Sequence, residues 1–311
     1  MKEVQRDIAI SKYINPYTDF GFKKLFGSEL NKDLLIGFLN ALFEEARQIP
    51  GDKILDVKYL SNEELGRTAY DRKAVFDVLC ETEKGVKFHL EMQNVFQEFF
   101  IDRTIFYAAR SIQNMAKRDS ATNGRWNFQL QKLYSVNLLN FTFKEKDKKD
   151  DYGNSTKKIV NEISDDDLMH CVMLKNVKTD KIFYDKLVFI YLEMPKFQKP
   201  IEECHTFYEK WLFVLQNLTR LMERPKELQE RVFVRLFEQA EIAKYTPEEY
   251  SAYEDSLVSL WDIANSNEAA EQKGAENKAK EIALSLKALG TMPIAQIAEI
   301  TKLTLDEINS L

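Results

Sequence analysis

Apolar residues recur at three- and four-residue steps in two segments of the N-terminal half of the chain, which predicts two amphipathic helices. In the first segment, Glu29 to Ala46, the recurring residues are Leu30, Leu34, Leu35, Phe38, Leu39 and Leu42. In the second segment, Gln97 to Lys117, they are Phe100, Ile101, Ile105, Ala108, Ala109, Ile112 and Met115. Each predicted helix therefore has one apolar face that must pack against another element.

Short, largely apolar runs predict strands between and after these two helices. The runs are Ile54 to Leu60, Ala74 to Cys80, Val86 to Gln93 and Leu133 to Phe143, followed by Met169 to Leu174 and Leu187 to Met194. The segment Glu83-Lys84-Gly85 separates the second run from the third at a length suited to a hairpin turn. The order helix, three strands, helix, strand predicts an α/β core in which helices face one sheet, with additional strands after it.

The pattern becomes helical after residue 200 and stays so to the end of the chain. The helical segments are Phe207 to Met222, Lys226 to Tyr245, Pro247 to Asn265 and Glu268 to Leu289, followed by a short helical hairpin that begins near Pro293. We therefore predict three regions: an α/β domain over residues 1–200, a helical subdomain over 201–265, and an Ala-, Lys- and Glu-rich helix with a terminal hairpin over 266–311.

Charge and composition narrow the function only slightly. The chain has 44 Lys and Arg against 50 Asp and Glu, a net charge of −6. This charge excludes a wholly basic nucleic-acid coat protein. It does not exclude a metal-dependent nuclease, whose site concentrates carboxylates. The sequence has no apolar run of the roughly 20 residues that span a bilayer, no secretory signal and only 3 cysteines. We expect a cytoplasmic protein without a membrane segment, and the lack of a GxxxxGK[ST] loop predicts no nucleotide cofactor.

The most informative chemistry lies on the predicted hairpin. In the strand Val86 to Gln93, His89, Glu91 and Gln93 alternate with apolar residues and share one face. Asp77 interrupts an apolar strand, where a carboxylate is costly unless it is paired or binds a cation. The hairpin can bring Asp77 close to Glu91, and two such carboxylates suit a hard cation such as Mg²⁺. A half-buried hairpin with a polar outer face is the competing interpretation, and spacing alone favours it.

Two motifs together resemble a known family. Asp77, followed by Glu91-Met92-Gln93, resembles the PD-(D/E)XK nuclease signature in its D…ExQ form. The segment from Thr18 to Gly27 is similar to the DxxFKxxFG opening of the PD-(D/E)XK nuclease family transposases, also called recombination-promoting nucleases. Further similar stretches are Asn31 to Ile36, Phe38 to Asn40, Leu192 to Phe197 and the Ala-rich tail, so the resemblance covers most of the chain.

The resemblance implies a restriction-endonuclease-like fold and a Mg²⁺-dependent DNA endonuclease that acts in recombination or transposition, with Mn²⁺ as a substitute metal. It implies that Asp77 and Glu91 hold the metal and that Gln93 takes the position of the usual lysine. Glutamine can hydrogen-bond but brings no positive charge, so the charge that stabilises the transition state is left unassigned. Lys73, at an even offset from Asp77 on the same predicted strand, and Lys23 in the opening motif are two candidates for it.

Other residues are candidates with a weaker basis. Asp19 and Lys23 are four residues apart and would form either part of the site or a surface ion pair. Arg103 could bind a phosphate with two parallel hydrogen bonds, although a solvated helix arginine is the commoner outcome. His89, which shares a face with Glu91, and Tyr107 complete the predicted set, but a lone histidine on a strand is more often a polar residue at a sheet edge.

A second function class remains open at this point. The missing lysine and the negative net charge also fit a module that kept the nuclease fold, lost cleavage, and binds nucleic acid or a protein partner. Metal binding separates the two hypotheses, because the inactive module predicts no metal at the site or binding without turnover. DNA is the expected partner of the enzyme, and a symmetric homodimer would supply two metal centres to cut both strands.

Overall fold

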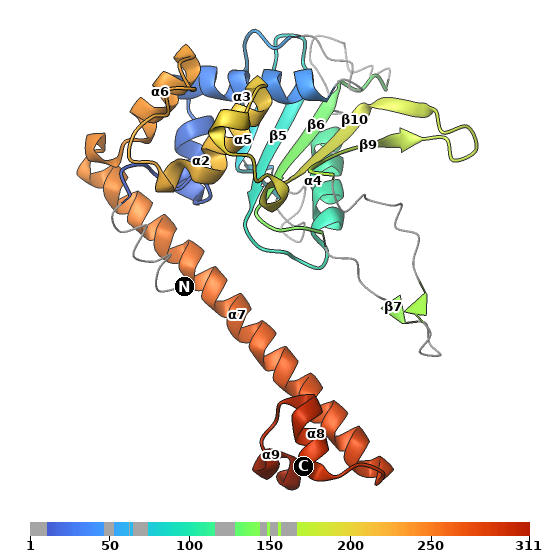
Figure 1. Ribbon diagram of the computed structural model, residues 1–311. Helices are drawn as coiled ribbons and strands as arrows, with labels where there is room; N and C mark the ends of the chain where they lie inside the picture. The colour runs from blue at the N-terminus through green and yellow to red at the C-terminus, as the bar shows by residue number, and fades with distance from the viewer. Residues whose placement is uncertain are drawn as a thin grey trace. The chain divides into compact units, whose positions relative to one another are not determined.

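Residues 1–256 are built around a six-stranded mixed sheet (Figure 1). The computed structural model describes residues 11–46, 53–61, 63–64, 74–115, 128–143, 148–149, 155–156 and 167–311. In spatial order the strands are β1 (Lys58–Tyr59), β4 (Val78–Glu81), β5 (Lys87–Gln93), β6 (Leu133–Leu139), β10 (Ile182–Glu193) and β9 (Met169–Lys175). The strands β5, β6 and β10 run parallel, and the other neighbouring pairs are antiparallel. Two small antiparallel pairs lie outside this sheet: β2 (Glu63–Glu64) with β3 (Ala74–Val75), and β7 (Lys148–Lys149) with β8 (Ser155–Thr156).

Helices cover both faces of the sheet. Neighbouring residues of a strand point to opposite faces, so one strand contacts both helical layers. On one face, Phe43 of α3 (Lys32–Glu45) packs against Phe88 of β5 and Tyr134 of β6, with ring centroids 5.9 and 4.7 Å apart. On the other face, Ser111 of α4 (Phe100–Met115) hydrogen-bonds to His89 of β5. Phe88 and His89, which are neighbours on β5, therefore point to two different helices, α3 and α4.

The structure confirms the predicted fold class, a helix, three strands, a helix and a strand followed by further strands and a helical C-terminal region. Three predicted strands are shorter than the apolar runs suggested, and one of them, expected over residues 133–143, ends at Leu139. The run from residue 54 forms only β1, because the backbone N–H and C=O of Ile54 bond to the side chain of Asn40 instead of a strand. The run from residue 74 is interrupted at Phe76 and Asp77, before β4 begins.

The opening motif forms the short helix α2 (Asp19–Phe26), and each of its residue types has a structural reason. The Thr18 side chain caps the helix by accepting a hydrogen bond from the N–H of Gly21 at 2.9 Å. Phe22 and Phe26 are buried and anchor the helix in the core. Gly21 packs so closely on the preceding turn that an added Cβ would lie 2.1 Å from the carbonyl oxygen of Asn15.

We expect Gly21→Ala to lower the free energy of unfolding by about 3 kcal/mol, because the new methyl group must displace backbone as well as the capping Thr18. Urea denaturation of the full chain measures the change. Gly274→Ala is the matched control, since no atom lies within 4 Å of a Cβ added there, and we expect it to leave stability unchanged or raise it slightly. An equal loss for both variants would contradict this explanation of the motif.

The first helices of the C-terminal half pack against the opening motif. These are α5 (Phe207–Asn217) and α6 (Arg231–Ala240). Trp211 of α5 is fully buried, and its ring lies among those of Phe26, Phe38 and Phe233 at centroid distances of 6.0, 5.8 and 5.1 Å. This aromatic cluster joins α2, α3, α5 and α6. Short 3-10 turns complete this part of the chain: Glu29–Asn31, Met194–Lys196, Ile201–Glu203, Leu218–Arg220 and Ile242–Lys244.

The chain divides into two compact units, residues 1–256 and residues 257–311. The two helical segments predicted around residue 266 are one continuous helix, α7 (Pro247–Leu289). The second unit has its own small core of Ala283, Ile297, Leu303 and Ile308, built with α8 (Ile294–Thr301) and α9 (Leu305–Ser310). The predicted boundaries at 200 and 265 stay predictions. Over the part of the chain that the structure describes, no helix combines the length and the apolar character needed to cross a membrane.

Candidate functional site

A row of polar residues crosses the sheet on the face covered by α4. Asp77 immediately precedes Val78, which pairs with Leu90, so that Asp77 lies opposite Glu91. Glu91 in turn pairs with Asn137 on the parallel strand β6. Asp77 directly before β4, Glu91 on β5 and Asn137 on β6 therefore lie at one level of the sheet, as the hairpin register predicted for the first two.

Backbone N–H groups of the hairpin hold both carboxylates. The N–H of Met92 donates to Oδ2 of Asp77 at 2.7 Å, and the N–H of Asp77 donates to the Glu91 carboxylate. Glu91 is only 9% exposed, and its Oε1 atom is buried without a hydrogen-bond partner within the described residues. A buried carboxylate oxygen without a donor is rare in folded proteins and marks this position as one where another group is expected to bind.

The electrostatic environment of the two carboxylates is unfavourable for two negative charges. Burial raises the pKa of Glu91 well above its ordinary value, and the neighbouring charge of Asp77 raises it further. Burial also raises the pKa of Asp77. The positive charges of Arg103 and Lys23 act in the opposite direction on both groups. Both carboxylates therefore carry a negative charge less readily than exposed ones, and a bound cation would relieve this cost.

Gln93 and Arg103 form the positive side of this site. The Nη2 atom of Arg103 donates to Oε1 of Gln93, and its Nη1 atom donates to Oε1 of Gln97 at 2.7 Å. The Gln93 amide nitrogen donates to the carbonyl oxygen of Val95 at 2.7 Å, which fixes the orientation of that side chain. The guanidinium also lies over the ring of Phe100, 5.1 Å from its centroid. The structure thus brings together two of the predicted residues, Gln93 and Arg103.

The opening motif contributes the remaining charges. Lys23 and Asp19 of α2 form an ion pair with an N–O distance of 2.7 Å, and their side chains are 40% and 64% exposed. The charges of Asp19 and Lys23 both act on the pKa of Asp77. The two residues are therefore a surface ion pair that lies at the border of the site. The predicted Lys73 lies outside the residues that the structure describes.

His89 lies on the same face of the sheet as Glu91 and contacts α4. The strand β5 is central in the sheet and His89 is 1% exposed, so the interpretation as a polar residue at a sheet edge is wrong. Its Nε2 atom and Oγ of Ser111 are 2.8 Å apart. Burial lowers the pKa of His89 to about 3, which keeps the ring neutral at physiological pH. The Phe76 ring separates it from Tyr107, with centroids 4.3 Å from His89 and 5.2 Å from Tyr107.

Sequence reasoning missed Asn137, Ser111 and Gln97. Asn137 is fully buried; its Nδ2 atom donates to Ser135 and to the carbonyl oxygen of Ile190, and its Oδ1 atom has no hydrogen-bond partner within the described residues. The signal was available, because Ser135 and Asn137 are two polar residues at alternate positions of the otherwise apolar run from residue 133 to 139. A narrow crevice between α4 and the sheet is lined by Glu91, Arg103, Ser135 and Asn137, among others.

The raised pKa of Glu91 predicts how stability depends on pH in metal-free buffer. Because the folded pKa lies above the unfolded value, the folded state binds the proton more tightly, and stability falls as pH rises from about 4.5 through the folded pKa. The fall approaches about 1.4 kcal/mol for each pH unit between the two pKa values. We expect Glu91→Gln to be more stable than the wild type at pH 8 in EDTA and to lose this advantage near pH 4.5. Urea denaturation at the two pH values measures the difference, and an advantage that does not change with pH would contradict the assignment.

The comparisons with known proteins agree with the two motifs. Residues 16–270 match the family described as "PD-(D/E)XK nuclease family transposase". The searches of curated proteins and of solved structures found no match. The matched residues include α2, the sheet with Asp77 and Glu91, and the helices up to the middle of α7. The mixed sheet flanked by helices is the restriction-endonuclease-like fold of this family, and the chain belongs to the PD-(D/E)XK nuclease family transposases.

Proposed function

We propose that the protein is a Mg²⁺-dependent DNA endonuclease whose site is the polar row of Asp77, Glu91 and Asn137. The observation that carries this proposal is that Asp77 lies next to Glu91 in the hairpin. The Oε1 atom of Glu91 is buried and has no hydrogen-bond partner within the described residues. The family is a nuclease family linked to transposition, and PD-(D/E)XK nucleases generally use divalent metal ions. Breakage of DNA during recombination or transposition, inside the cytoplasm, is the setting that this family suggests.

The residues present suit a divalent metal ion. Asp77 and Glu91 offer carboxylate oxygens, which are the ligands that Mg²⁺ prefers, and a bound cation would remove the repulsion between the two charges. The described residues contain no group of three or more His, Cys, Asp or Glu side chains placed to hold a metal ion, so the site offers two carboxylates. Mg²⁺ keeps several water ligands and commonly takes only one or two protein carboxylates. Mn²⁺ fits the same oxygen ligands and is the natural substitute.

When bound, such a metal supplies an activated water and charge stabilisation at the scissile phosphate. Arg103 takes over the charge that the missing lysine would bring, since its guanidinium hydrogen-bonds to Gln93 at the lysine position. The hydrogen bond from the Gln93 amide nitrogen to the carbonyl oxygen of Val95 leaves the Gln93 amide oxygen directed at Arg103. Lys23 at the border of the site contributes a second positive charge for the DNA backbone. The phosphodiester bond is hydrolysed, and no covalent intermediate with the protein is needed.

We expect Arg103→Ala to reduce the DNA cleavage rate by about 100-fold, because it removes the positive charge next to Gln93. Arg103→Lys should recover part of the loss, since it restores the charge without the forked hydrogen bonds. Arg110→Ala is the matched control, because Arg110 lies on the same helix but bonds to Gln113 and packs on Phe106. Equal cleavage rates for Arg103→Ala and Arg110→Ala would rule out this role.

The proposed function is tested by incubating supercoiled plasmid with the purified wild-type protein in Mg²⁺, in Mn²⁺ and in EDTA. Cutting in either metal but not in EDTA supports the nuclease. DNA binding without cutting in both metals supports the inactive nuclease-fold module instead. That alternative is favoured by Gln93, which stands at the position of the usual lysine. The ratio of nicked to linear product further indicates whether one strand or both are cut, as a homodimer with two sites would do.

A further inference from the structure

The hairpin of β9 and β10 reaches beyond the rest of the sheet. The strand β6 pairs with β10 only from Leu187 onward, whereas β10 begins at Ile182 and is joined to β9 by a turn at residues 176–181. Residues 174–186, the ribbon, are therefore two strands that pair only with each other within the described part of the chain (Figure 1).

The turn of the ribbon is held by its own hydrogen bonds. Oδ1 of Asn176 accepts hydrogen bonds from the N–H groups of Lys178 and Thr179 at 2.9 and 3.1 Å. The N–H of Asn176 donates to the carbonyl oxygen of Lys181 at 2.8 Å. A protruding hairpin is only marginally stable in water, and these bonds keep its shape before a partner binds.

The ribbon is basic in an acidic protein. Between residues 174 and 186 the sequence has four lysines and two aspartates, while the whole chain has a net charge of −6. Lys178 and Lys181 are exposed, and their side chains form no hydrogen bond or ion pair with any described residue. Lys175 pairs with Asp180 at 3.1 Å, but both side chains are largely exposed, so this pair is weak. The ribbon therefore presents positive charge to a polyanion.

Apolar side chains project from the same ribbon. Phe183 is 79% exposed. It is the extra residue of a β-bulge, because two steps along β10, from Ile182 to Tyr184, face one step along β9. Leu174 and Val177 are exposed as well. DNA-binding proteins place such side chains against base edges or wedge them between base steps.

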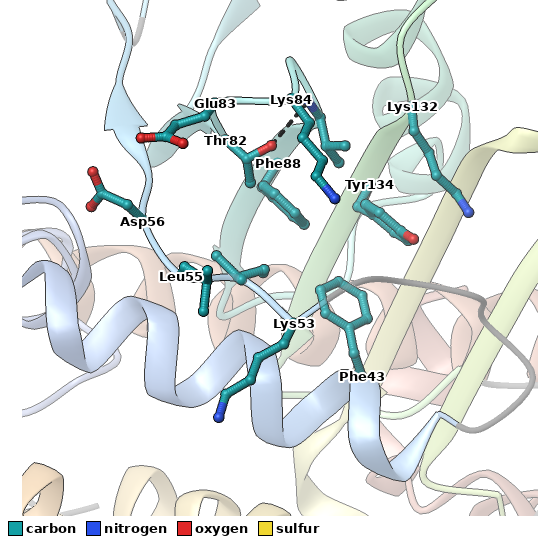
Figure 2. Close-up of a pocket in the computed structure, with 12 residues that line it drawn as sticks. Phe43, Lys53, Leu55, Asp56, Thr82, Glu83, Lys84, Phe88, Lys132 and Tyr134 are labelled. Atoms are coloured by element: carbon teal, nitrogen blue, oxygen red, sulfur yellow. Dashed lines mark hydrogen bonds between the residues drawn. The ribbon is translucent and has the colours of Figure 1, made fainter.

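A cavity of about 580 Å³ on the face covered by α3 is a poorer surface for a nucleic acid (Figure 2). Its aromatic residues Phe88 and Tyr134 are only 2% and 3% exposed. They also stack on each other, with centroids 5.3 Å apart, so they offer no ring face to a base. The exposed side chains of the ribbon have no such restriction.

The ribbon and the polar row can reach the same duplex. Tyr191 of β10 pairs with Asn137, which in turn pairs with Glu91, so Tyr191 marks the level of the site. At about 3.3 Å per residue, β10 spans at most about 30 Å from Tyr191 back to Ile182. This length is slightly less than the ~34 Å of one helical turn of DNA. The major groove, which is ~12 Å wide, admits a two-stranded ribbon.

We infer that the ribbon is a DNA-binding arm that lies in a groove of the duplex while the phosphodiester bond lies at the polar row. Lys178 and Lys181 contact backbone phosphates, and Phe183 contacts the bases. The choice of double-stranded DNA as the partner rests on the proposed function. Because phosphate contacts position the duplex, the arm determines how tightly DNA is held rather than the chemistry of cleavage.

Fluorescence anisotropy of a labelled DNA duplex of about 30 bp, titrated with the full chain in EDTA, tests the arm without cleavage. In the double variant Lys178→Ala, Lys181→Ala, we expect binding about tenfold weaker and a salt dependence with a slope lower by about 2, because two phosphate contacts are lost. Phe183→Ala should weaken binding several-fold without changing the slope, since it removes no charge.

The matched control removes the same charge elsewhere. Lys226 and Lys278 are exposed and lie outside the ribbon, and the double variant Lys226→Ala, Lys278→Ala should bind within about twofold of the wild type. Equal weakening by this control, ribbon variants that bind like the wild type, or no duplex binding by the wild type overturns the inference.

Plasmid cleavage separates the failure of this inference from the failure of the proposed function. The ribbon variants should mainly raise the KM for plasmid, and cleavage with an unchanged KM would overturn the arm alone. Duplex binding that the ribbon variants weaken, without any cleavage by the wild type, would support the arm and overturn the nuclease. If Phe183→Ala changed the oligomeric state in size-exclusion chromatography but not duplex binding, the partner of the ribbon would be a second copy of the chain, and the inference would be wrong.

Discussion

Asp77→Asn and Glu91→Gln should each reduce Mg²⁺-dependent plasmid cleavage by about 10²- to 10³-fold or more. Each substitution keeps the size of the side chain and removes one of the two negative charges that would hold the metal. The amide oxygen that Asp77→Asn introduces can still accept the hydrogen bond that the N–H of Met92 donates to Asp77 at 2.7 Å, so the hairpin should keep its register. The initial rate of plasmid nicking at saturating Mg²⁺ is the measurement.

The control is chosen from the same strand. Glu81→Gln removes a carboxylate at the far end of β4, where Glu81 pairs with Lys87, and we expect its cleavage rate to match the wild type. Circular dichroism and urea denaturation of all three variants separate a chemical defect from unfolding. Cleavage by Asp77→Asn and Glu91→Gln at the wild-type rate would show that the reaction takes place elsewhere.

The second large effect is on stability. Trp211→Ala should lower the free energy of unfolding by about 3–5 kcal/mol, which is a large part of the 5–15 kcal/mol of a typical domain. The indole is fully buried among three phenylalanine rings at 5.1 to 6.0 Å, and alanine leaves a cavity that the helices α2, α3, α5 and α6 can fill only partly. Thermal and urea denaturation measure the loss.

Phe183→Ala provides the comparison, because it removes an aromatic ring that is 79% exposed on β10. We expect a change within about 0.5 kcal/mol for this variant. If both variants lost the same stability, the aromatic cluster around Trp211 would not be what joins the opening motif to the core. Because α2 carries Lys23 and Asp19 to the border of the site, a weakened Trp211 cluster should also slow cleavage near the melting temperature.

The hairpin that carries the site could be predicted from sequence because its information is local. The turn at Lys84-Gly85 and the alternation along residues 86–93 together fix which residues oppose each other. From this register, Asp77 is expected opposite Glu91, and in the structure Asp77 directly precedes Val78, which pairs with Leu90. The overall order of helices and strands follows in the same way, since each element shows its own period.

Other features depend on contacts between distant segments. The bond from Arg103 to Gln93 requires that α4 cross the sheet at one particular level, and no pattern within the helix specifies that level. The loss of the predicted strand at Ile54 depends on the side chain of Asn40, which competes with a neighbouring strand for the same backbone groups. The burial of His89 depends on the central position of β5 in the sheet, which its pairing with β6 decides and no local pattern reveals.

Binding of Mn²⁺ in the absence of DNA tests the central claim most directly, because it does not depend on substrate choice or turnover. Titration calorimetry at pH 8 should give a saturable site in the wild type that is lost in the double variant Asp77→Asn, Glu91→Gln, while Glu81→Gln keeps it. Affinity should also fall as pH is lowered, since both carboxylates must be ionised to bind. Absence of binding in the wild type, or equal binding in the double variant, would contradict the assignment of Asp77 and Glu91 as the metal site.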